Sequence, residues 1–416
     1  MSEIVGPLKW RLSFLEDVLE KIIGGGTPSR KVEEYYTGNI SWVTVKDLVH
    51  HKISSSQEYI TEKAIQNSAT NLIPKGNVII ATRMAVGKAF INEVDVAINQ
   101  DLKALIPNKN IIETKFLLYF LMNKSEEIEK MGTGTTVKGI RLEQLKKIRI
   151  NVPSLPEQRK IAAILTSVDD AIEKTEAIIK QTEKAKKGLM QQLLTKGIGH
   201  TEFKQTEIGE IPEAWGVELL DNVATRKSGH TPNKKINNYW NGSIPWISLK
   251  DTQKLDNRYI RETTDYTTNA GIKNSSAVLL PAGTVVISRD ATVGKVGIMG
   301  VKMATSQHFI NYICGQTIDS RFLYYYLLSC RSIFKRIAAG NTIKTIGLPF
   351  FKEFKIALPP INEQRQISKI LWAVDDRIEY EKKYLEQLGV LKKALMQSLL
   401  TGKVRVKVDE NAEVTA

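Results

Sequence analysis

The sequence has little cysteine and histidine. Cys314 and Cys330 are its only two cysteines, too few for a disulfide framework or a four-cysteine zinc site. We therefore expect a cytoplasmic protein in a reducing environment, without a bound metal. The five histidines are His50, His51, His200, His230 and His308. They lack metal-ligand spacing, so we interpret them as surface or packing residues.

Long apolar runs are also missing. No uninterrupted apolar stretch approaches the roughly 18 residues that a membrane-spanning helix needs. The start of the chain, with Glu3 and Pro7 before Trp10, does not combine a basic stretch with an apolar core as a signal peptide does. We expect a soluble protein with no membrane partner.

The short motifs of several enzyme classes are absent as well. The glycine-rich segments 24–27 and 132–136 are not followed by the Gly-Lys-Ser or Gly-Lys-Thr of a phosphate-binding loop. No Asn-Pro-Pro-Tyr-like segment is present that could hold a flipped base beside a methyl donor. The acidic pairs 169–170 and 375–376 lie inside helical patterns, where solvated flanking positions explain them. The sequence therefore predicts no catalytic residue and no cofactor bound by this chain.

Positive charge is what the sequence has in excess. Its 59 lysines and arginines outnumber 45 acidic residues, giving a formal net charge of +14. Such a balance favours a polyanionic partner, because basic side chains that neutralise phosphates release condensed counterions. A basic protein without nucleic-acid function remains the alternative. The 416 residues, 42% of them hydrophobic, are enough for two domains.

An internal repeat organises the chain. Seven residues recur at an offset of 204, the distance from Thr27 to Thr231: Thr27, Pro28, Tyr35, Gly38, Trp42, Lys46 and Asp47 return as Thr231, Pro232, Tyr239, Gly242, Trp246, Lys250 and Asp251. The similarity continues with small register shifts until 153–195 matches 359–401. A whole unit has therefore been duplicated.

The first part of each copy reads as a compact α/β domain. Residues 8–152 and 211–358 mix turn residues and helical stretches with short β-rich runs such as Asn77–Ala81 and Thr284–Ser288. The repeated Trp42 and Trp246 lie in apolar alternating runs. We interpret them as core anchors rather than platforms on which bases stack.

The second part of each copy is a long predicted helix with one apolar seam. The seam residues are Ile161, Leu165, Val168, Ile172, Ile179, Leu189 and Leu193 in the first copy, and Ile367, Leu371, Val374, Ile378, Leu385, Leu388, Leu395 and Leu399 in the second. Thr175, Thr182 and Lys186 interrupt the first seam, and Glu381 and Lys392 interrupt the second. The three- and four-residue steps predict pairing of the two helices as an antiparallel coiled coil, in preference to two unrelated core helices.

The ends of these helices carry recognisable signals. Ser154 with Glu157 resembles a capping box, and Asn362 is the predicted cap of the second helix. Gly197 and Gly402 suit helix termination. Each helix is then about 40 residues, or roughly 60 Å, long.

Both predicted helices open with Glu-Gln-Arg, at 157–159 and 363–365, and close with Leu-Met-Gln-x-Leu-Leu-Thr, at 189–195 and 395–401. This order of two α/β units alternating with two such helices resembles the specificity subunit of type I restriction–modification systems. The resemblance covers nearly the whole chain and leaves only the tail after Lys403 without a counterpart. It implies an α+β fold in which two pseudo-symmetric α/β target-recognition domains are joined by two long helices paired as an antiparallel coiled coil. The implied divisions are recognition domains at 1–152 and 199–358, spacer helices at 153–198 and 359–403, and a tail at 404–416.

The resemblance also implies a function. The chain is expected to be the non-catalytic, DNA-binding subunit of a methyltransferase and endonuclease complex, reading two short blocks of double-stranded DNA separated by unspecified bases. Its expected protein partners are two methyltransferase (modification) subunits and the restriction/translocase subunits, which bind S-adenosylmethionine, ATP and magnesium. The alternatives are a self-sufficient DNA methyltransferase or nuclease component, and a coiled-coil assembly protein without nucleic-acid function.

Basic and polar residues near the repeated turns are the predicted DNA contacts. They are Ser29, Arg30, Lys31, Arg83, Lys88, Lys138 and Arg141 in the first copy, and Asn233, Lys234, Lys235, Arg289, Lys295 and Lys344 in the second. An ordinary solvated charge is the alternative for each of them.

Overall fold

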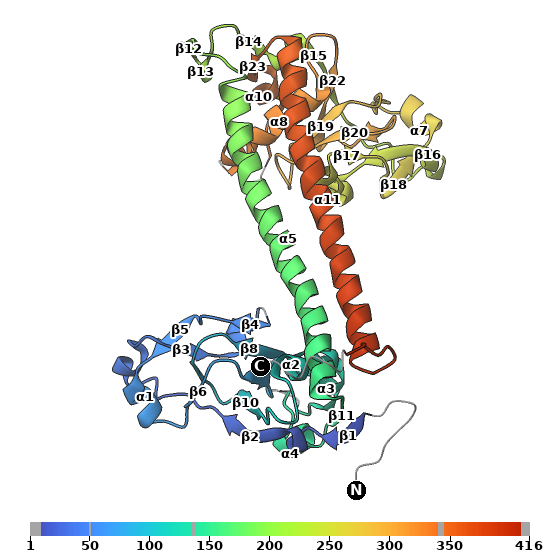
Figure 1. The fold of residues 1–416 in the computed structure, drawn as a ribbon. Coiled ribbons are helices and arrows are strands. Elements are labelled where there is room, and N and C mark those ends of the chain that lie inside the picture. The colour runs from blue at the N-terminus through green and yellow to red at the C-terminus, as the bar shows by residue number, and fades with distance from the viewer. Residues whose placement is uncertain (1–9, 50, 135–137, 340–344, 409–416) are drawn as a thin grey trace. The chain divides into compact units, whose positions relative to one another are not determined.

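The computed structural model describes residues 10–49, 51–134, 138–339 and 345–408 (Figure 1). The chain forms two compact units, one of residues 1–176 with 383–416 and the other of residues 177–382. The two long helices are α5 (Leu155–Thr195) and α11 (Ile361–Leu399). Each of them contributes one stretch to the first unit and another stretch to the second. No helix in the described ranges is both long and apolar enough to cross a bilayer.

The first unit contains two mixed sheets and a short strand pair. The five-stranded sheet has the order β2 (Leu19–Gly24), β10 (Leu102–Pro107), β7 (Val78–Ala81), β8 (Ala89–Asn92) and β4 (Lys52–Ile53). The four-stranded sheet has the order β5 (Glu58–Ile60), β3 (Ile40–Val43), β9 (Val96–Ile98) and β6 (Asn71–Ile73), and β1 (Arg11–Phe14) pairs with β11 (Arg149–Val152). The helices are α1 (Glu62–Gln66), α2 (Thr114–Asn123), α3 (Ser125–Met131) and α4 (Leu142–Lys146).

The second unit repeats this topology. Its five-stranded sheet has the order β15 (Ala224–Ser228), β22 (Phe309–Cys314), β19 (Val285–Ser288), β20 (Val296–Met299) and β17 (Tyr259–Ile260). A three-stranded sheet has the order β18 (Asp265–Thr267), β16 (Trp240–Ile247) and β21 (Ala304–Thr305), and β14 (Gly216–Leu219) pairs with β23 (Lys355–Leu358). A hairpin of β12 (Phe203–Thr206) and β13 (Gly209–Pro212) is added, and the helices are α6 (Leu220–Val223), α7 (Asn269–Lys273), α8 (Ser320–Ser329), α9 (Arg331–Ala339) and α10 (Leu348–Lys352).

The central strands form because their residues suit a doubly buried sheet. All four residues of β7 and of β19 are buried, and most are β-branched. Trp42 and Trp246 are each only 2% exposed. Their indole nitrogens donate to the backbone oxygens of Gly26 and His230. The prediction that the two tryptophans anchor the core is confirmed.

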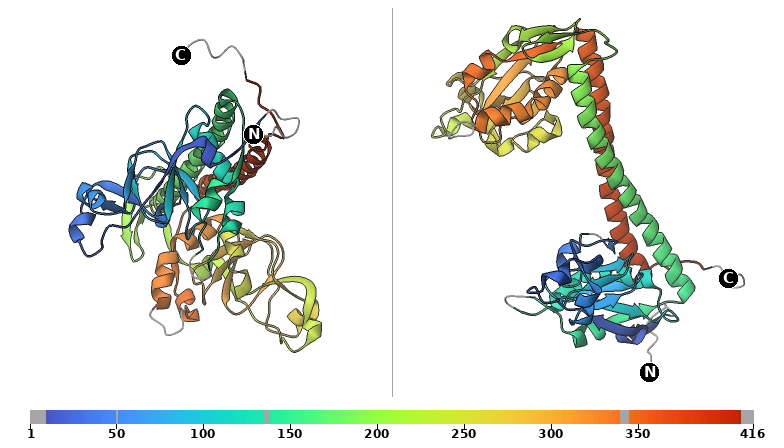
Figure 2. Two further views of the ribbon diagram at one scale, coloured as in Figure 1. Left: turned by 90° about the horizontal axis from the view of Figure 1, so that it is seen from below. Right: turned by 90° about the vertical axis from the view of Figure 1, so that its left-hand side faces the viewer.

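Within each unit, a stretch of α11 lies beside a stretch of α5 (Figure 1, Figure 2). In the first unit, Ile161 and Leu165 pack in one core cluster with Leu399, and in the second unit Ile367 and Leu371 pack with Leu193. The early part of one helix therefore meets the late part of the other. The two helices run antiparallel, as the fold-class prediction required.

None of the fifteen predicted seam residues is exposed. Nine are buried: Ile161, Leu165, Val168, Leu193, Ile367, Leu371, Ile378, Leu388 and Leu399. Six are half-buried: Ile172, Ile179, Leu189, Val374, Leu385 and Leu395.

Two lysines that interrupt the apolar seams pair with aspartates on the opposite helix. Lys392 of α11 lies 2.6 Å from Asp169 of α5, and Lys186 of α5 lies 2.6 Å from Asp375 of α11. Asp169 is 1% exposed, so the prediction that both residues of each acidic pair are solvated is wrong for its first member. The helical period turns the first aspartate onto the seam and the second, Asp170 or Asp376, toward solvent.

The repeated Glu-Gln-Arg sequence ties each long helix to its α/β part. Gln158 accepts from the backbone of Glu113 and donates to the carbonyls of Ile111 and Pro153. Gln364 makes the same three bonds to Asp319, Thr317 and Pro359. Both glutamines are fully buried. The motif that marks the family resemblance is thus a structural joint.

The preceding glutamate of the motif holds a tryptophan. Glu157 accepts from the Trp10 indole at 3.1 Å, and Glu363 accepts from the Trp215 indole at 2.9 Å. The joint therefore includes the first two residues of the motif.

The predicted helix ends are correct except at the two caps. Ser154 accepts from the backbone amide of Glu157, but the Glu157 carboxylate binds Trp10 and Arg405 and does not complete a capping box. Gly197 and Gly402 have φ of 67° and 73°, the left-handed conformation that ends a helix. Asn362 does not cap α11, which begins one residue earlier at Ile361. The Pro360 carbonyl accepts from Glu363 and Gln364, so Asn362 already lies in the first turn.

Candidate nucleic-acid interface

The loop after the first strand of each five-stranded sheet approaches a second turn closely. A Cβ on Gly25 would lie 2.1 Å from the carbonyl oxygen of Ile98, and one on Gly229 would lie 2.1 Å from that of Ser306. Only glycine fits such an approach. The repeated threonine then binds the same turn, since Thr27 donates to Gln100 at 2.5 Å and Thr231 donates to Gln307 at 2.6 Å.

In the first unit, this loop carries a strongly held arginine. Arg30 forms a bidentate pair with Glu58 at 2.7 and 2.8 Å, and its guanidinium lies 4.3 Å from the ring centroid of Tyr36. The hydrogen bond to Glu58 raises the pKa of Arg30 above its usual value. The neighbouring Ser29 and Lys31 are exposed.

In the second unit, the equivalent cation is a lysine with different surroundings. Lys234 is exposed and lies 5.9 Å from the Trp246 ring centroid. Asp265 pairs with Trp246 in the strand register, as Glu58 does with Trp42, but it binds Lys250 at 3.0 Å instead. Asn233 and Lys235 are exposed beside Lys234.

A hollow opens beside this lysine. Its volume is ≈ 330 Å³, and its polar lining includes Lys234, Lys250, Gln307 and His308. Amide, imidazole and ammonium groups of this kind hydrogen-bond to phosphates and base edges.

A second loop, after β7 or β19, meets the same turn. Arg83 is half-exposed, and its guanidinium lies 3.6 Å from Asp101, the residue after Gln100. The next residue, Met84, has φ of 62°, and its amide donates to the carbonyl of Lys138. The turn at 99–101 thus contacts both loops, through Thr27 in the first and Arg83 in the second. The second loop in turn bonds the backbone of Lys138.

The corresponding loop of the second unit is more closed. Arg289 donates to the carbonyl of Ile346, and its side chain is 19% exposed. Asp290 binds His308 at 2.7 Å and also accepts from Thr345.

The remaining predicted contacts lie apart from these turns or are engaged elsewhere. Lys295 is paired with Asp256, and Lys88 lines a hollow beside α5. Arg141 is exposed at the start of α4. Lys344 lies outside the described residues.

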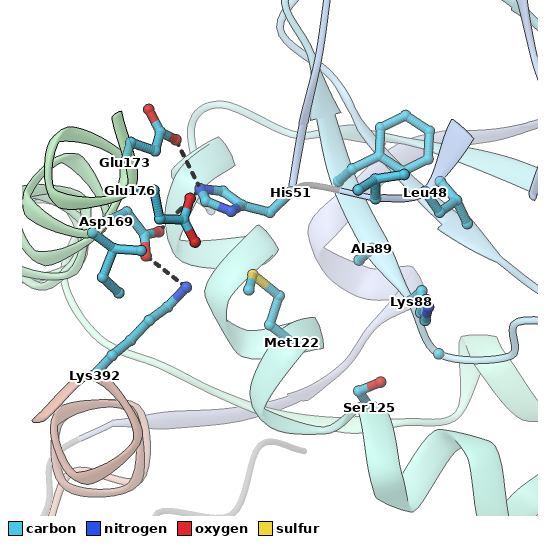
Figure 3. A pocket seen from close by; sticks show the side chains of 14 residues that line it. Leu48, His51, Lys88, Ala89, Met122, Ser125, Asp169, Glu173, Glu176 and Lys392 are labelled. Atoms are coloured by element: carbon cyan, nitrogen blue, oxygen red, sulfur yellow. Dashed lines mark ion pairs between the residues drawn. The ribbon is translucent and has the colours of Figure 1, made fainter. Parts of the chain in front are cut away.

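The hollow beside α5 has a polar cluster that periodicity did not reveal (Figure 3). It has a volume of ≈ 380 Å³, and Asp169 lies between His51 at 3.1 Å and Lys392 at 2.6 Å. Tyr119 donates to the same carboxylate. Burial by itself raises the pKa of Asp169, but the close contacts with His51 and Lys392 outweigh it and lower the pKa to about 2.

The second unit contains an equivalent cluster. Tyr325 donates to Asp375 at 2.7 Å, and Arg258 reaches Asp376 and Glu379 at 2.7 Å each. The signal in the sequence was the equal offset of 206 between Asp169 and Asp375 and between Lys186 and Lys392. Within the described residues, no group of three or more His, Cys, Asp or Glu side chains is placed to hold a metal ion.

A family model and a curated relative both match this chain, and both belong to the same family. The model of the type I restriction modification DNA specificity domain matches residues 7–184 and again residues 212–389. The chain is 32% identical to the putative type I restriction enzyme MjaX specificity subunit of Methanocaldococcus jannaschii, covering 96% of this chain and 95% of the relative.

Solved structures share the fold at low sequence identity. The type I restriction-modification S subunit from M. genitalium has a TM-score of 0.60 at 15% identity, covering 96% of this chain and 98% of that one. A chain from a study of assembly and conformational transition of the type I R-M system has a TM-score of 0.61 at 16% identity, covering 95% and 98%.

Proposed function

Because this chain belongs to the family of type I restriction–modification DNA specificity subunits, we propose that it reads a DNA target of two short blocks separated by unspecified bases. In this family the specificity subunit recognises DNA and does not catalyse the reaction. Each recognition domain, at 1–152 and 199–358, reads one block. The helical segments 153–198 and 359–403 set the gap.

One observation carries this proposal: the two domains present the same loops with different side chains. Thr27 and Thr231 fix the loops to equivalent turns, yet Arg30 is replaced by Lys234 and Arg83 by Asp290. Two domains with the same backbone and different polar side chains are suited to recognising two different DNA sequences, because side chains identify bases by their hydrogen-bonding patterns.

The likeness of the two units supports the docking of two methyltransferase subunits. Each unit presents an α5 stretch against an α11 stretch with an equivalent lysine–aspartate pair. Two copies of one methyltransferase subunit therefore find equivalent surfaces, one on each unit. Those modification subunits and the restriction/translocase subunits supply S-adenosylmethionine, ATP and magnesium chemistry.

Mapping of methylated adenines across the genome, with and without this gene, tests the function. We expect loss of methylation at one bipartite sequence when the gene is deleted. Replacing residues 10–152 with those of a homologue should change one block and leave the other block and the gap intact. A change in both blocks contradicts independent readers.

Docking is tested by DNA affinity. We expect weak binding by the chain alone and tight binding with its methyltransferase subunits, because partner contacts stabilise the DNA-competent arrangement. Equal affinity in both preparations contradicts the docking proposal.

A further inference from the structure

The two domains carry opposite charges at one equivalent position. Met84 and Ala291 are non-glycine residues with φ of 62° and 56°, and they are followed three residues later by Gly87 and Gly294, both with positive φ. This shared backbone aligns Arg83 with Asp290. The same offset of 207, the distance from Gly87 to Gly294, aligns Asp101 with His308.

In the first domain, the cation is available. Arg83 is 50% exposed, and its 3.6 Å contact with Asp101 is longer than a bidentate pair such as that of Arg30 with Glu58. Lys103 adds a second positive charge nearby: burial lowers its pKa, Asp101 opposes the shift and Arg83 contributes to it. The single carboxylate of Asp101 thus faces two cationic side chains, Arg83 and Lys103. The net charge of this group of three side chains is positive.

In the second domain, the position of Arg83 holds the carboxylate of Asp290, which is already paired. Asp290 binds Nδ1 of His308 at 2.7 Å and accepts from the Thr345 hydroxyl. The other ring nitrogen of His308 lies 3.4 Å from the Gln307 amide nitrogen. The turn therefore presents an imidazole and an amide where the first domain presents a guanidinium.

We propose that the Arg83/Asp290 position determines specificity: Arg83 reads a guanine in the block of the first domain, and the Asp290–His308 pair prevents guanine reading by the second domain at the equivalent point. This inference rests on the proposed function, since it assigns a base to one of the two readers. Guanine follows from the geometry of the side chain, because its N7 and O6 acceptors match the two parallel donors of an arginine.

The left-handed backbone of Met84 and Ala291 supports the view that this turn presents the side chain of the preceding residue. A non-glycine residue with positive φ is uncommon and costs conformational energy. Both domains keep one directly after the exchanged residue, although the side chains Met84 and Ala291 differ. The backbone turn is therefore common to both domains, and the chemistry that it presents differs.

Arg83→Lys is the decisive variant, because lysine keeps the charge and loses the planar fork. The full chain, assembled with its modification subunits, is measured by competition with duplexes that each carry one substituted base pair of the mapped target. We expect the preference for one G·C pair of the first block to fall about tenfold or more. Affinity for non-target DNA and every preference in the second block should stay within about twofold of the parent.

Arg149→Ala is the matched control. It removes an exposed arginine of the same unit from β11, which belongs to a separate two-stranded sheet. Its base preferences should equal those of the parent. Unchanged discrimination by Arg83→Lys at all positions overturns the proposal, and so does an equal loss at every position, which is the signature of a phosphate contact.

The double substitution Arg83→Asp with Asp101→His places the second domain's pair in the first domain. We expect it to abolish the same guanine preference and to leave the second block intact. A retained guanine preference overturns the assignment even if the lysine variant behaves as expected. If the parent complex itself shows no bipartite preference, the proposed function fails, a result distinct from failure of this inference.

Discussion

Lys186 of α5 pairs with Asp375 of α11 at 2.6 Å, and the repeat generates the reciprocal pair of Lys392 with Asp169 at the same distance. Each aspartate also accepts from a tyrosine of its own α/β part, Tyr325 or Tyr119. A polar pair at an apolar seam fixes the register of two helices, because any shift leaves a charge buried without a partner.

Removing the lysine of the buried pair should destabilise the first unit. We expect Lys392→Met to lower the free energy of unfolding by about 3 kcal/mol, because Asp169 then stays buried without its closest cation. Urea unfolding measures the loss. Lys393→Met, at the exposed neighbouring position, is the control and should cost little. Asp169→Asn combined with Lys392→Met should recover much of the loss, and a fully additive double variant would contradict a direct coupling.

The same cluster predicts an acid-sensitive contribution to stability. The folded pKa of Asp169, about 2, lies below its ordinary value of 3.8. The unfolded chain therefore takes up the proton first, and stability from Asp169 is present above about pH 4 and disappears as the pH falls toward 2. The difference in unfolding free energy between the parent and Asp169→Asn should shrink over that window.

The joint at the start of α11 depends on one buried glutamine. Gln364→Met should lower the free energy of unfolding by about 2–3 kcal/mol, because it leaves the amide of Asp319 and the carbonyls of Thr317 and Pro359 without their partner. Thermal or urea unfolding measures the loss. Arg365→Met, at the exposed neighbouring residue, should have little effect. Equal losses in both variants would speak against the joint.

The exposed lysines of the second domain should act on affinity rather than on sequence preference. We expect Lys234→Ala and Lys235→Ala each to weaken DNA binding by the assembled complex and to reduce the slope of log affinity against log salt by about one, as expected for a phosphate contact. The control is Lys273→Ala, on the short helix α7. Binding titrations at several salt concentrations give the slopes, and an altered base preference would reassign these lysines to base reading.

Lengthening both helices together should change the gap between the two blocks. Seven residues inserted after Thr182 and seven after Lys382 preserve the pairs of Lys186 with Asp375, Lys382 with Glu183 and Lys392 with Asp169. A heptad adds about 10 Å of helix, equivalent to roughly three base pairs. Methylation mapping should therefore show a longer gap, or a loss of methylation where the added twist misplaces one reader.

Insertion after Thr182 alone is the control for this experiment. It places the seven residues in one helix only, so it breaks the register on one side and should lower stability. An unchanged gap with full methylation after the paired insertion would mean that the helices do not set the spacing.

The sequence by itself determined the duplication, the two α/β parts and the paired helices. These follow from local signals: a recurring order of Thr-Pro, Trp and Lys-Asp, and apolar residues at helical steps from Ile161 to Leu193 and from Ile367 to Leu399. The tryptophans Trp42 and Trp246 were assigned to the core because an alternating apolar run already implies burial on one face.

Only the tertiary structure decided which polar residues are buried and what they contact. Asp169 meets Tyr119, His51 and Lys392, which are 50, 118 and 223 positions away in the sequence. The periodicity of apolar residues describes one helix at a time. It therefore predicted that Asp169 is solvated and that Lys392 only interrupts the apolar seam. Likewise, Arg83 and Lys295 read as equal basic candidates, until folding left the first half-exposed beside Asp101 and paired the second with Asp256. The charge that a loop offers depends on which carboxylates the fold brings to it, and that is set by contacts between distant segments.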